Sequence, residues 1–388
     1  MTLGRKAELD FVIFGATGFT GRLIAKRLAD TYGDGGKYRW GLAGRDGPGL
    51  AHLRDRLGWP RLPLILADVN DPRSLDEMAR RARFVLSAVG PYQLYGTPVL
   101  EACLREGAGY VDMCGEPHWM ADMIRRYDAK ARERGVTALL SCGFDSTVWE
   151  LGVMAVQETA QSRFGRPAPE VRSRLLRMKG ALSGGTAATA RETISRMMGS
   201  PQVAALLRDP FALTPGFRGP EQPDGESLRF DPDIARTVGP ILMAAINTKN
   251  IHRSNFLQGH PWGRDFRYEE LAVIDEEEVS DGGSPLAATA PRPGDGPPRS
   301  VLEAGYFDIM VIGIDPSGRR IACEVQAKGD PAYLATSRIV SEILAAASEA
   351  PVLPAGLWTA GAALGSGLAD RLTRSADVTF TTSVLAKG

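Results

Sequence analysis

The sequence predicts an α/β protein with a Rossmann-type, doubly wound parallel sheet and a second domain of mixed α+β structure. Two observations support this prediction. Short apolar runs alternate with stretches of helical spacing through the first 145 residues, and a glycine-rich turn follows the first of these runs. Unbroken apolar strands between amphipathic helices are what a parallel sheet needs when helices cover both of its faces.

Six segments of this first part have strand character, and a helical stretch follows each of the first five. In chain order the strand-like segments are FVIFG, YRWGLAG, LPLILAD, FVLSAVG, GYVDMCG and VTALLSCG. This order of strand and helix assigns residues 1–145 to a Rossmann-type domain.

The regular alternation then stops, and residues 146–334 are predicted to form a domain for substrate binding or dimerisation. Strand-like VRSRLLRMKGAL is followed there by helical GGTAATARETISRMM, and the turn PSG between two apolar runs predicts a β-hairpin. Residues 275–300 are acidic and then rich in Pro and Gly, which predicts a flexible loop. The last segment, about 335–388, is expected to pack back on the first domain.

The composition excludes several classes of protein. The 46 basic residues balance 46 acidic ones, so neither a nucleic acid nor a polybasic membrane anchor is predicted. The four cysteines form no CxxC pair and the four histidines no HExxH spacing, so no metal site is predicted. A polar N-terminus completes the prediction of a cytoplasmic protein. The uncharged segment 350–369 is either a buried or interface segment or a peripheral membrane contact.

The glycine-rich turn FVIFGATGFTGRLIAKRLAD predicts a dinucleotide site. Gly15 would permit the tight turn, Gly18 the close approach of a pyrophosphate, and Gly21 the packing of helix on strand. The predicted contacts are Gly15, Ala16, Thr17, Gly18, Phe19, Thr20 and Gly21.

The ends of the next strands define the rest of the cofactor site. Arg45 follows the second strand, where an arginine suits the 2′-phosphate of NADP, although the neighbouring Asp46 leaves NAD open. Asp68 and Val69 follow the third strand, where they would meet the adenine. The turn after the fourth strand would contact the ribose and nicotinamide through Ala88, Val89, Gly90 and Pro91.

From VGPYQLYGTPVLEACLREGAGYVDMCGEP onward, the sequence resembles the saccharopine dehydrogenase-like oxidoreductases, whose pattern there is close to GPYxxYGxPVVxACxxxGxxYxDxxGE. The resemblance continues through SCGFDS, SGGT, HRSN, KGDPAYLATSRIVSEIL and LWTAGAALG, and within the group it is strongest to bacterial trans-acting enoyl reductases. It implies NADPH-dependent reduction of a carbon–carbon double bond on polyketide-derived lipid intermediates. Two stretches depart from the family pattern: TVWELG stands for IPSDLG, and TAG stands for TPA.

A reaction of this kind needs a group that stabilises or protonates the enolate left by hydride transfer. Tyr92 and Tyr95 follow the nicotinamide turn, and Tyr92 is the first choice, with packing over the cofactor or holding the loop as its alternative role. Asp145 is a further catalytic candidate, and Cys142 a substrate contact, because both follow the sixth strand at the ligand-binding edge. The same residues could instead form the hinge between the domains.

The remaining candidates for substrate contact are Ser183, Thr186 and His252. Ser183 and Thr186 lie in SGGT, which could also be an ordinary helix N-cap. The expected partner is a hydrophobic acyl substrate, either free or bound to a carrier. Whether the protein forms a homodimer is left open. Two other functions stay open: a saccharopine-type enzyme acting on a carbon–nitrogen bond, and a non-catalytic NADP-binding sensor or lipid-surface protein.

Overall fold

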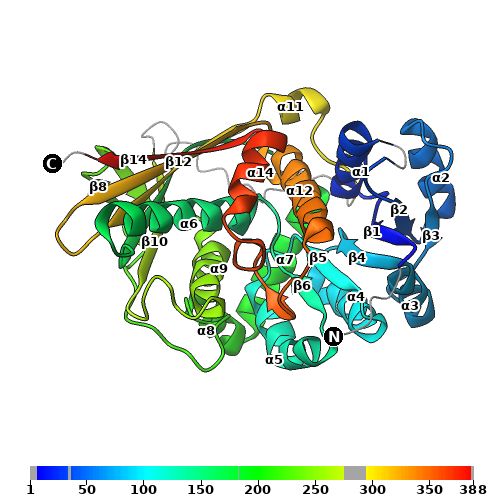
Figure 1. The fold of residues 1–388 in the computed structure, drawn as a ribbon, viewed down its shortest axis with the longest axis horizontal. Coiled ribbons are helices and arrows are strands. Elements are labelled where there is room, and N and C mark those ends of the chain that lie inside the picture. The colour runs from blue at the N-terminus through cyan, green and yellow to red at the C-terminus, as the bar shows by residue number, and fades with distance from the viewer. Residues whose placement is uncertain (1–6, 34–35, 182, 275–293, 386–388) are drawn as a thin grey trace.

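The chain folds around two seven-stranded sheets, which lie at opposite ends of the view in Figure 1. The computed structural model describes residues 7–33, 36–181, 183–274 and 294–385. Most of the predicted flexible loop, residues 275–293, therefore lies outside the described residues.

The first sheet is parallel throughout and has the order β13-β6-β5-β4-β1-β2-β3. The Rossmann-type prediction is confirmed. Its strands are β1 (Leu9–Phe14), β2 (Trp40–Gly44), β3 (Leu64–Leu66), β4 (Ala82–Ser87), β5 (Gly109–Asp112), β6 (Thr137–Leu139) and β13 (Gly356–Trp358). The crossover helices are α1 (Phe19–Tyr32), α2 (Gly47–Arg56), α3 (Pro72–Arg81), α4 (Tyr92–Glu106) and α5 (Pro117–Arg134).

Alternate residues of β1 enter different hydrophobic cores, as the two-residue period of a strand requires. Phe11 and Ile13 belong to one core cluster, and Val12 and Phe14 belong to the other. The cluster of Phe11 continues into the second sheet, where it includes Val311. One hydrophobic core thus joins the two domains.

The second sheet is mixed and has the order β14-β12-β11-β7-β10-β9-β8. Only β7 and β10 pair in parallel, and the predicted hairpin is formed by β11 and β12. The strands are β7 (Glu170–Lys179), β8 (Arg229–Asp231), β9 (Arg236–Gly239), β10 (Arg267–Val273), β11 (Tyr306–Ile314), β12 (Arg320–Lys328) and β14 (Val378–Leu385).

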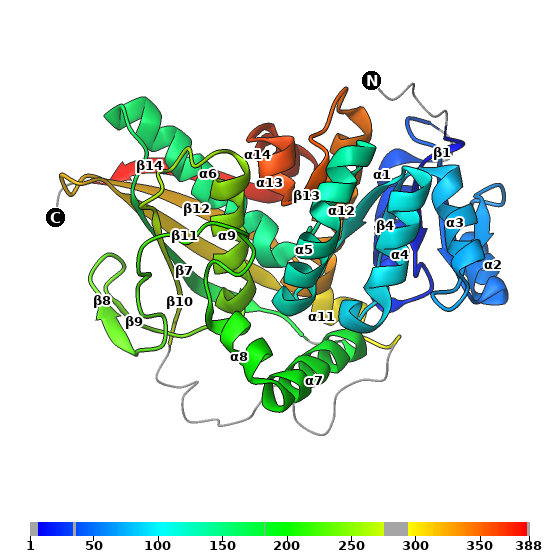
Figure 2. The same ribbon diagram turned by 90° about the horizontal axis from the view of Figure 1, so that it is seen from below.

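Two helices connect this sheet to the first domain. The long helix α6 (Phe144–Phe164) lies against β11 and β12, and a Cβ built at its Gly152 would lie 3.0 Å from both Val311 and Val325. Helix α9 (Ala244–Leu257) packs on α6 and on β10. The N-terminal part of α6 contacts α9, because Asn250 Nδ2 donates to Ser146 Oγ at 2.6 Å, and Figure 2 shows both helices beside the second sheet.

The C-terminal segment is divided between the domains. Helix α12 (Thr336–Glu349) contacts α1, and β13 extends the parallel sheet, whereas β14 joins the second sheet. The segment was predicted to pack on the first domain as a whole. This prediction is wrong for β14, which pairs with β12 in the second sheet. The remaining elements are α7 (Gly184–Gly199), α8 (Pro201–Arg208), α11 (Arg299–Glu303), a π-helical turn η1 (Pro331–Ala335), α13 (Ala360–Leu364) and α14 (Gly367–Ser375).

The uncharged segment 350–369 contains β13 and α13. Leu357 of β13 and Ala360 of α13 are almost fully buried. No helix in the described ranges combines the length and the apolar character that crossing a membrane would take.

Candidate active site

The glycine-rich turn has the geometry of a phosphate cradle. Gly15 has a φ of 84°, and a Cβ built there would lie 2.6 Å from the Val89 side chain. A Cβ at Gly21 would lie 2.3 Å from the Gly15 carbonyl oxygen, so helix α1 touches the strand end directly. Helix α1 begins after Gly18 with no side-chain cap and no acidic residue in its first turn. Its first amides are thus left for an anion, which fits the pyrophosphate of a dinucleotide.

The residues after β2 favour NADP over NAD. The Asp46 side chain caps α2, where its Oδ1 accepts a hydrogen bond of 3.0 Å from the Gly49 amide. Arg45 is exposed, and its guanidinium has no ion pair or hydrogen bond within the described residues. Because the carboxylate is used for capping, Arg45 is the side chain left to meet a 2′-phosphate.

We predict that Arg45→Ser lowers NADPH affinity by about 10- to 100-fold, the effect of losing one charge-assisted contact, and leaves NADH affinity unchanged. Fluorescence titration of each cofactor measures both values. Arg61→Ser, another exposed arginine of the same domain, serves as the control and should change neither. An equal loss for NADPH and NADH would contradict the assignment.

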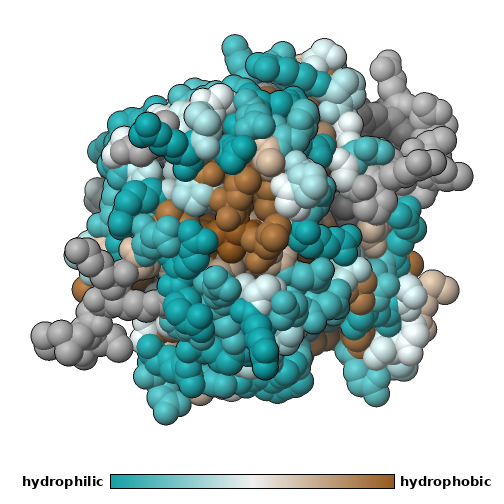
Figure 3. Space-filling model, turned by 90° about the vertical axis from the view of Figure 1, so that its right-hand side faces the viewer, coloured by the Kyte–Doolittle hydropathy of each residue, from teal (hydrophilic) through white to brown (hydrophobic). Residues whose placement is uncertain are grey.

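The adenine end of the site lies past β3. Asp68 forms a turn in which its Oδ1 accepts a 2.8 Å hydrogen bond from the Asn70 amide, and Val69 is half-buried. Figure 3 views this end of the molecule and shows hydrophobic side chains gathered near the centre of the face. Leu66, on the edge strand β3, is 66% exposed. The exposed Leu66, two residues before Asp68, is an apolar side chain that suits a flat purine ring.

The turn after β4 closes on the glycine cradle from the other side. The Ala88 amide donates a 2.9 Å hydrogen bond to Phe14, and the Val89 side chain faces Gly15. The peptide bond between Gly90 and Pro91 is cis. Helix α7 of the second domain lies over this turn, because a Cβ built at Gly90 would lie 3.8 Å from Thr189 Oγ1.

The structure gives Tyr92 the packing role rather than the catalytic one. Its hydroxyl donates to the Ser87 carbonyl at 2.9 Å and accepts from the Met113 amide at 3.3 Å. The ring is buried against Trp119, and burial raises the pKa of its hydroxyl well above the usual range. A hydroxyl held in this way offers no proton to a substrate. Tyr95 is 39% exposed on the same helix.

Cys142 and Asp145 have different environments after β6. Cys142 is completely buried in the hydrophobic core, and burial raises the pKa of its thiol well above the usual range, so the predicted substrate contact is not available to it. Asp145 interrupts the head of α6, since it has a ψ of 122° and the next residue, Ser146, has a φ of 86°. Burial raises the pKa of Asp145 to about 6. Its Oδ1 is buried without a hydrogen-bond partner in the described part of the chain.

Beside Asp145 lies a hydrogen-bond network, which the sequence did not predict. Asn250 Nδ2 donates to Ser146 Oγ at 2.6 Å, and Ser146 Oγ donates to Asn247 Oδ1 at 3.3 Å. Asn247 Nδ2 and the Tyr268 hydroxyl donate to the two oxygens of Glu270, at 2.8 and 2.9 Å. Burial raises the pKa of Glu270 to about 8, and the nearby Asp145 adds to the shift. The network brings α6, α9 and β10 together at the domain junction.

This network predicts a pH dependence of stability. Between the unfolded pKa of Glu270, 4.5, and its folded value of about 8, the folded state holds a proton that the unfolded state lacks, so stability falls as pH rises. Between pH 6 and pH 8, the free energy of unfolding of Glu270→Gln should fall by about 1–2 kcal/mol less than that of the wild type. Denaturant unfolding at both pH values measures this, and the exposed Glu158→Gln variant should behave like the wild type. The same change in unfolding free energy between the two pH values in all three proteins would refute this prediction.

Ser183 and Thr186 form the N-cap of α7. Ser183 Oγ accepts from the Thr186 amide at 3.4 Å, which is the capping role that the sequence left open. The cap is tied to Tyr333 of η1, whose hydroxyl lies 2.7 Å from Thr186 Oγ1 and accepts from the Ser183 amide. The Tyr333 ring packs edge-on against Phe19 of the glycine turn, with centroids 5.2 Å apart. Tyr333 therefore joins α7 to the cofactor cradle.

His252 does not take the position that was predicted for it. Its ring packs against Phe211, with centroids 4.5 Å apart, and its Nε2 lies 3.1 Å from Gln222 Oε1. Burial, helped by the charge of Lys249, lowers the pKa of His252 to about 3. His252 is therefore a neutral, buried side chain, and it is not positioned to contact a substrate.

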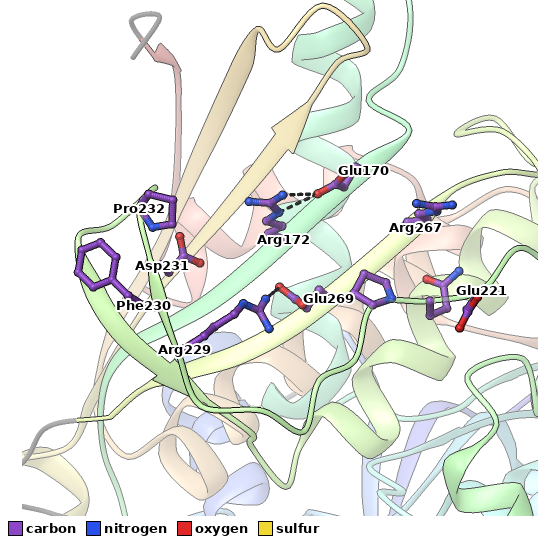
Figure 4. Close-up of a pocket in the computed structure, with 11 residues that line it drawn as sticks. Glu170, Arg172, Glu221, Arg229, Phe230, Asp231, Pro232, Arg267 and Glu269 are labelled. Atoms are coloured by element: carbon purple, nitrogen blue, oxygen red, sulfur yellow. Dashed lines mark hydrogen bonds and ion pairs between the residues drawn. The ribbon is translucent and has the colours of Figure 1, made fainter.

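Two features of the structure concern ligands other than the cofactor. Over the described ranges, no group of three or more His, Cys, Asp or Glu side chains could hold a metal ion. A cavity of about 420 Å³ lies in the second domain beside β7, β8 and β10 (Figure 4). Two ion pairs line it, Arg172 with Glu170 at 2.7 Å and Arg229 with Glu269 at 2.5 Å. Glu221 and Arg267 also line it, and the cavity lies in the second domain, away from the glycine turn.

Comparisons with known proteins agree with a Rossmann-type, NADP-binding first domain. Residues 11–139 match the saccharopine dehydrogenase NADP-binding domain. A Mycobacterium bovis protein named trans-acting enoyl reductase is 32% identical over 97% of this chain and 98% of its own length. A Mycobacterium tuberculosis protein provisionally given that name is 34% identical over 98% of both chains. Saccharopine dehydrogenase from Saccharomyces cerevisiae has the same fold, with a TM-score of 0.54 at 11% identity over 97% of this chain and 99% of its own.

Proposed function

Because the chain belongs to the saccharopine dehydrogenase-like oxidoreductases, together with the trans-acting enoyl reductases, we propose that it reduces an activated carbon–carbon double bond of a hydrophobic acyl substrate. The observation that carries the proposal is full-length similarity to proteins of that name at 32–34% identity. The NADP-binding domain supports the redox class, and we place the substrate at the junction of α6, α9 and β10 because Asp145 lies there at the carboxyl edge of the sheet.

For this reaction the protein has to position the substrate beside the cofactor and to supply one proton. NADPH held by the glycine turn would supply the hydride for the β carbon of an enoyl thioester, and the protein would then supply the proton for the α carbon. Asp145 is the candidate proton donor, because it stands at the carboxyl edge of the sheet and its raised pKa keeps part of it protonated near neutral pH. Tyr92 is not used, since its hydroxyl has two partners in the Rossmann domain.

NADPH oxidation over a panel of enoyl thioesters on coenzyme A tests the proposal. The expected result is turnover with at least one acyl chain and transfer of deuterium from labelled NADPH to the β carbon. Turnover only with an α-keto acid and an amine would instead indicate a saccharopine-type reaction on a carbon–nitrogen bond. Tight NADPH binding with no oxidation on any substrate would favour the sensor.

A further inference from the structure

The orientation of the Asn250 side chain is determined by its neighbours. An amide can be flipped without changing its shape, so its nitrogen and oxygen are assigned from the hydrogen-bond network. Glu270 accepts from Asn247 Nδ2, which directs Asn247 Oδ1 toward Ser146. The Ser146 hydroxyl donates to that oxygen, so it can only accept from Asn250, and Asn250 Nδ2 supplies this bond. With Glu270 Oε1 as the acceptor of Asn247 Nδ2, Asn250 Oδ1 is the amide atom that remains without a hydrogen bond among the described residues.

Two buried acceptors consequently lack donors at this junction. Asn250 is completely buried, and its Oδ1 has no partner within the described residues. Asp145 Oδ1, one residue from Ser146, is in the same state. Leaving a buried acceptor unsatisfied costs about 1–3 kcal/mol, so such atoms mark the place of a missing donor.

The loop that leads to Asp145 lies at the edge of the parallel sheet where the dinucleotide is expected to bind. The loop before Asp145 runs along the carboxyl ends of β5 and β6, because the Cys142 amide donates to the Asp112 carbonyl at 2.8 Å and a Cβ at Gly143 would lie 3.7 Å from Met113. Ligands of open α/β sheets bind outside this edge. A ligand bound at this edge is therefore a candidate source of the missing donor.

We propose that Asn250 Oδ1 and Asp145 Oδ1 form an acceptor pair that binds an amide N–H group of the ligand. Two sources have this chemistry: the carboxamide of the nicotinamide ring, and an amide in the arm of a carrier-bound acyl substrate. The second oxygen of Asp145 stays available for the proton that the proposed reduction needs. Only the substrate source rests on the proposed function.

The cofactor source is tested by binding alone. The reduced 3-acetylpyridine analogue of NADPH has a methyl group in place of the amide nitrogen, so it lacks the donor. Wild-type protein should bind NADPH about 10-fold or more tightly than this analogue, the effect of a buried, satisfied hydrogen bond. Asp145→Ala and Asn250→Ala should reduce the ratio toward one, and Asp145→Asn, which keeps an acceptor, should preserve it.

The substrate source gives a different result in the same variants. Wild type would then bind the two cofactors equally, and would prefer crotonyl-N-acetylcysteamine over the amide-free S-ethyl thiocrotonate in a titration of the NADP complex. That preference should disappear in Asp145→Ala. Asp145→Asn would keep the preference for the amide even if it lost turnover, so a failure of the proposed reduction is told apart from a failure of the acceptor pair.

A change in binding by Asp145→Ala should not result from unfolding of the variant. Asp145 has no hydrogen-bond partner among the described residues to lose at its Oδ1, so Asp145→Ala should unfold at the same temperature as the wild type or higher. Equal affinities for amide-bearing and amide-free ligands of both kinds, in wild type and in Asp145→Ala alike, would overturn the proposal.

Discussion

Gly21→Val should abolish NADPH binding, with a loss of at least about 100-fold in affinity, or roughly 3 kcal/mol. A Cβ at Gly21 would lie 2.3 Å from the Gly15 carbonyl oxygen and 2.9 Å from the Ala16 Cα. Both of these atoms are backbone, so the clash is relieved only by moving α1 away from β1. That movement takes the first amides of α1 away from the pyrophosphate, because they and the glycine turn form one cradle.

The matched control is Gly367→Val, at the first position of α14. A Cβ there would meet no atom within 4 Å, and NADPH should bind as it does to the wild type. Fluorescence titration measures both variants, and circular dichroism checks that each is folded. Unchanged NADPH affinity in a folded Gly21→Val protein would show that the dinucleotide does not use this turn.

The sequence was sufficient for the cradle because its determinants are local. Gly15, Gly18 and Gly21 lie within seven residues, and a turn between a strand and a helix needs no distant partner to define it. The same locality misled the choice of Tyr92: proximity to the nicotinamide turn says nothing about which way a side chain points. The ring turned inward because its hydroxyl meets Ser87 and Met113 on two neighbouring strand ends.

The junction network could not be read from the sequence, because its members are far apart along the chain. Ser146 meets Asn250 across 104 positions, and Asn247 meets Glu270 from another element. Tyr333 is a different case. It stands in the stretch KGDPAYLATSRIVSEIL, which the family resemblance had marked, but no local pattern gave its hydroxyl a partner. Only packing of η1 against the head of α7 brings Tyr333 to Thr186.

The two departures from the family pattern meet in space. Glu150, in TVWELG, accepts hydrogen bonds from Ser254 Oγ at 2.6 Å and from Thr359 Oγ1 at 2.7 Å. It also accepts from the amides of Gly361 and Ala362, both at 2.9 Å. A Cβ at Gly361 would lie 2.6 Å from the Glu150 carboxyl carbon. Where the family has Asp and Ala, this chain has Glu and Gly, so the longer acid occupies the space of the missing methyl group.

Glu150→Ala should therefore destabilise the protein by about 2–5 kcal/mol, because the amides of Gly361 and Ala362 lose their acceptor and the buried acid leaves a cavity. Denaturant unfolding measures the loss, and Glu158→Ala, an exposed residue of the same helix, should change stability by less than about 0.5 kcal/mol. A comparable loss in both variants would mean that α6 is sensitive to any truncation and that the Glu150 contacts carry no special weight.

The pairing of Glu150 with Gly361 can be measured as a coupling energy. Gly361→Ala alone forces a methyl group against the carboxylate and should cost about 1–3 kcal/mol. Glu150→Asp alone shortens the acid and stretches its bonds to Thr359 and Gly361. Because the shorter acid makes room for the methyl group, the double variant should lose about 1–3 kcal/mol less than the sum of the single losses. Additive losses would mean that the two departures arose independently and that the acid and the glycine do not compensate for each other.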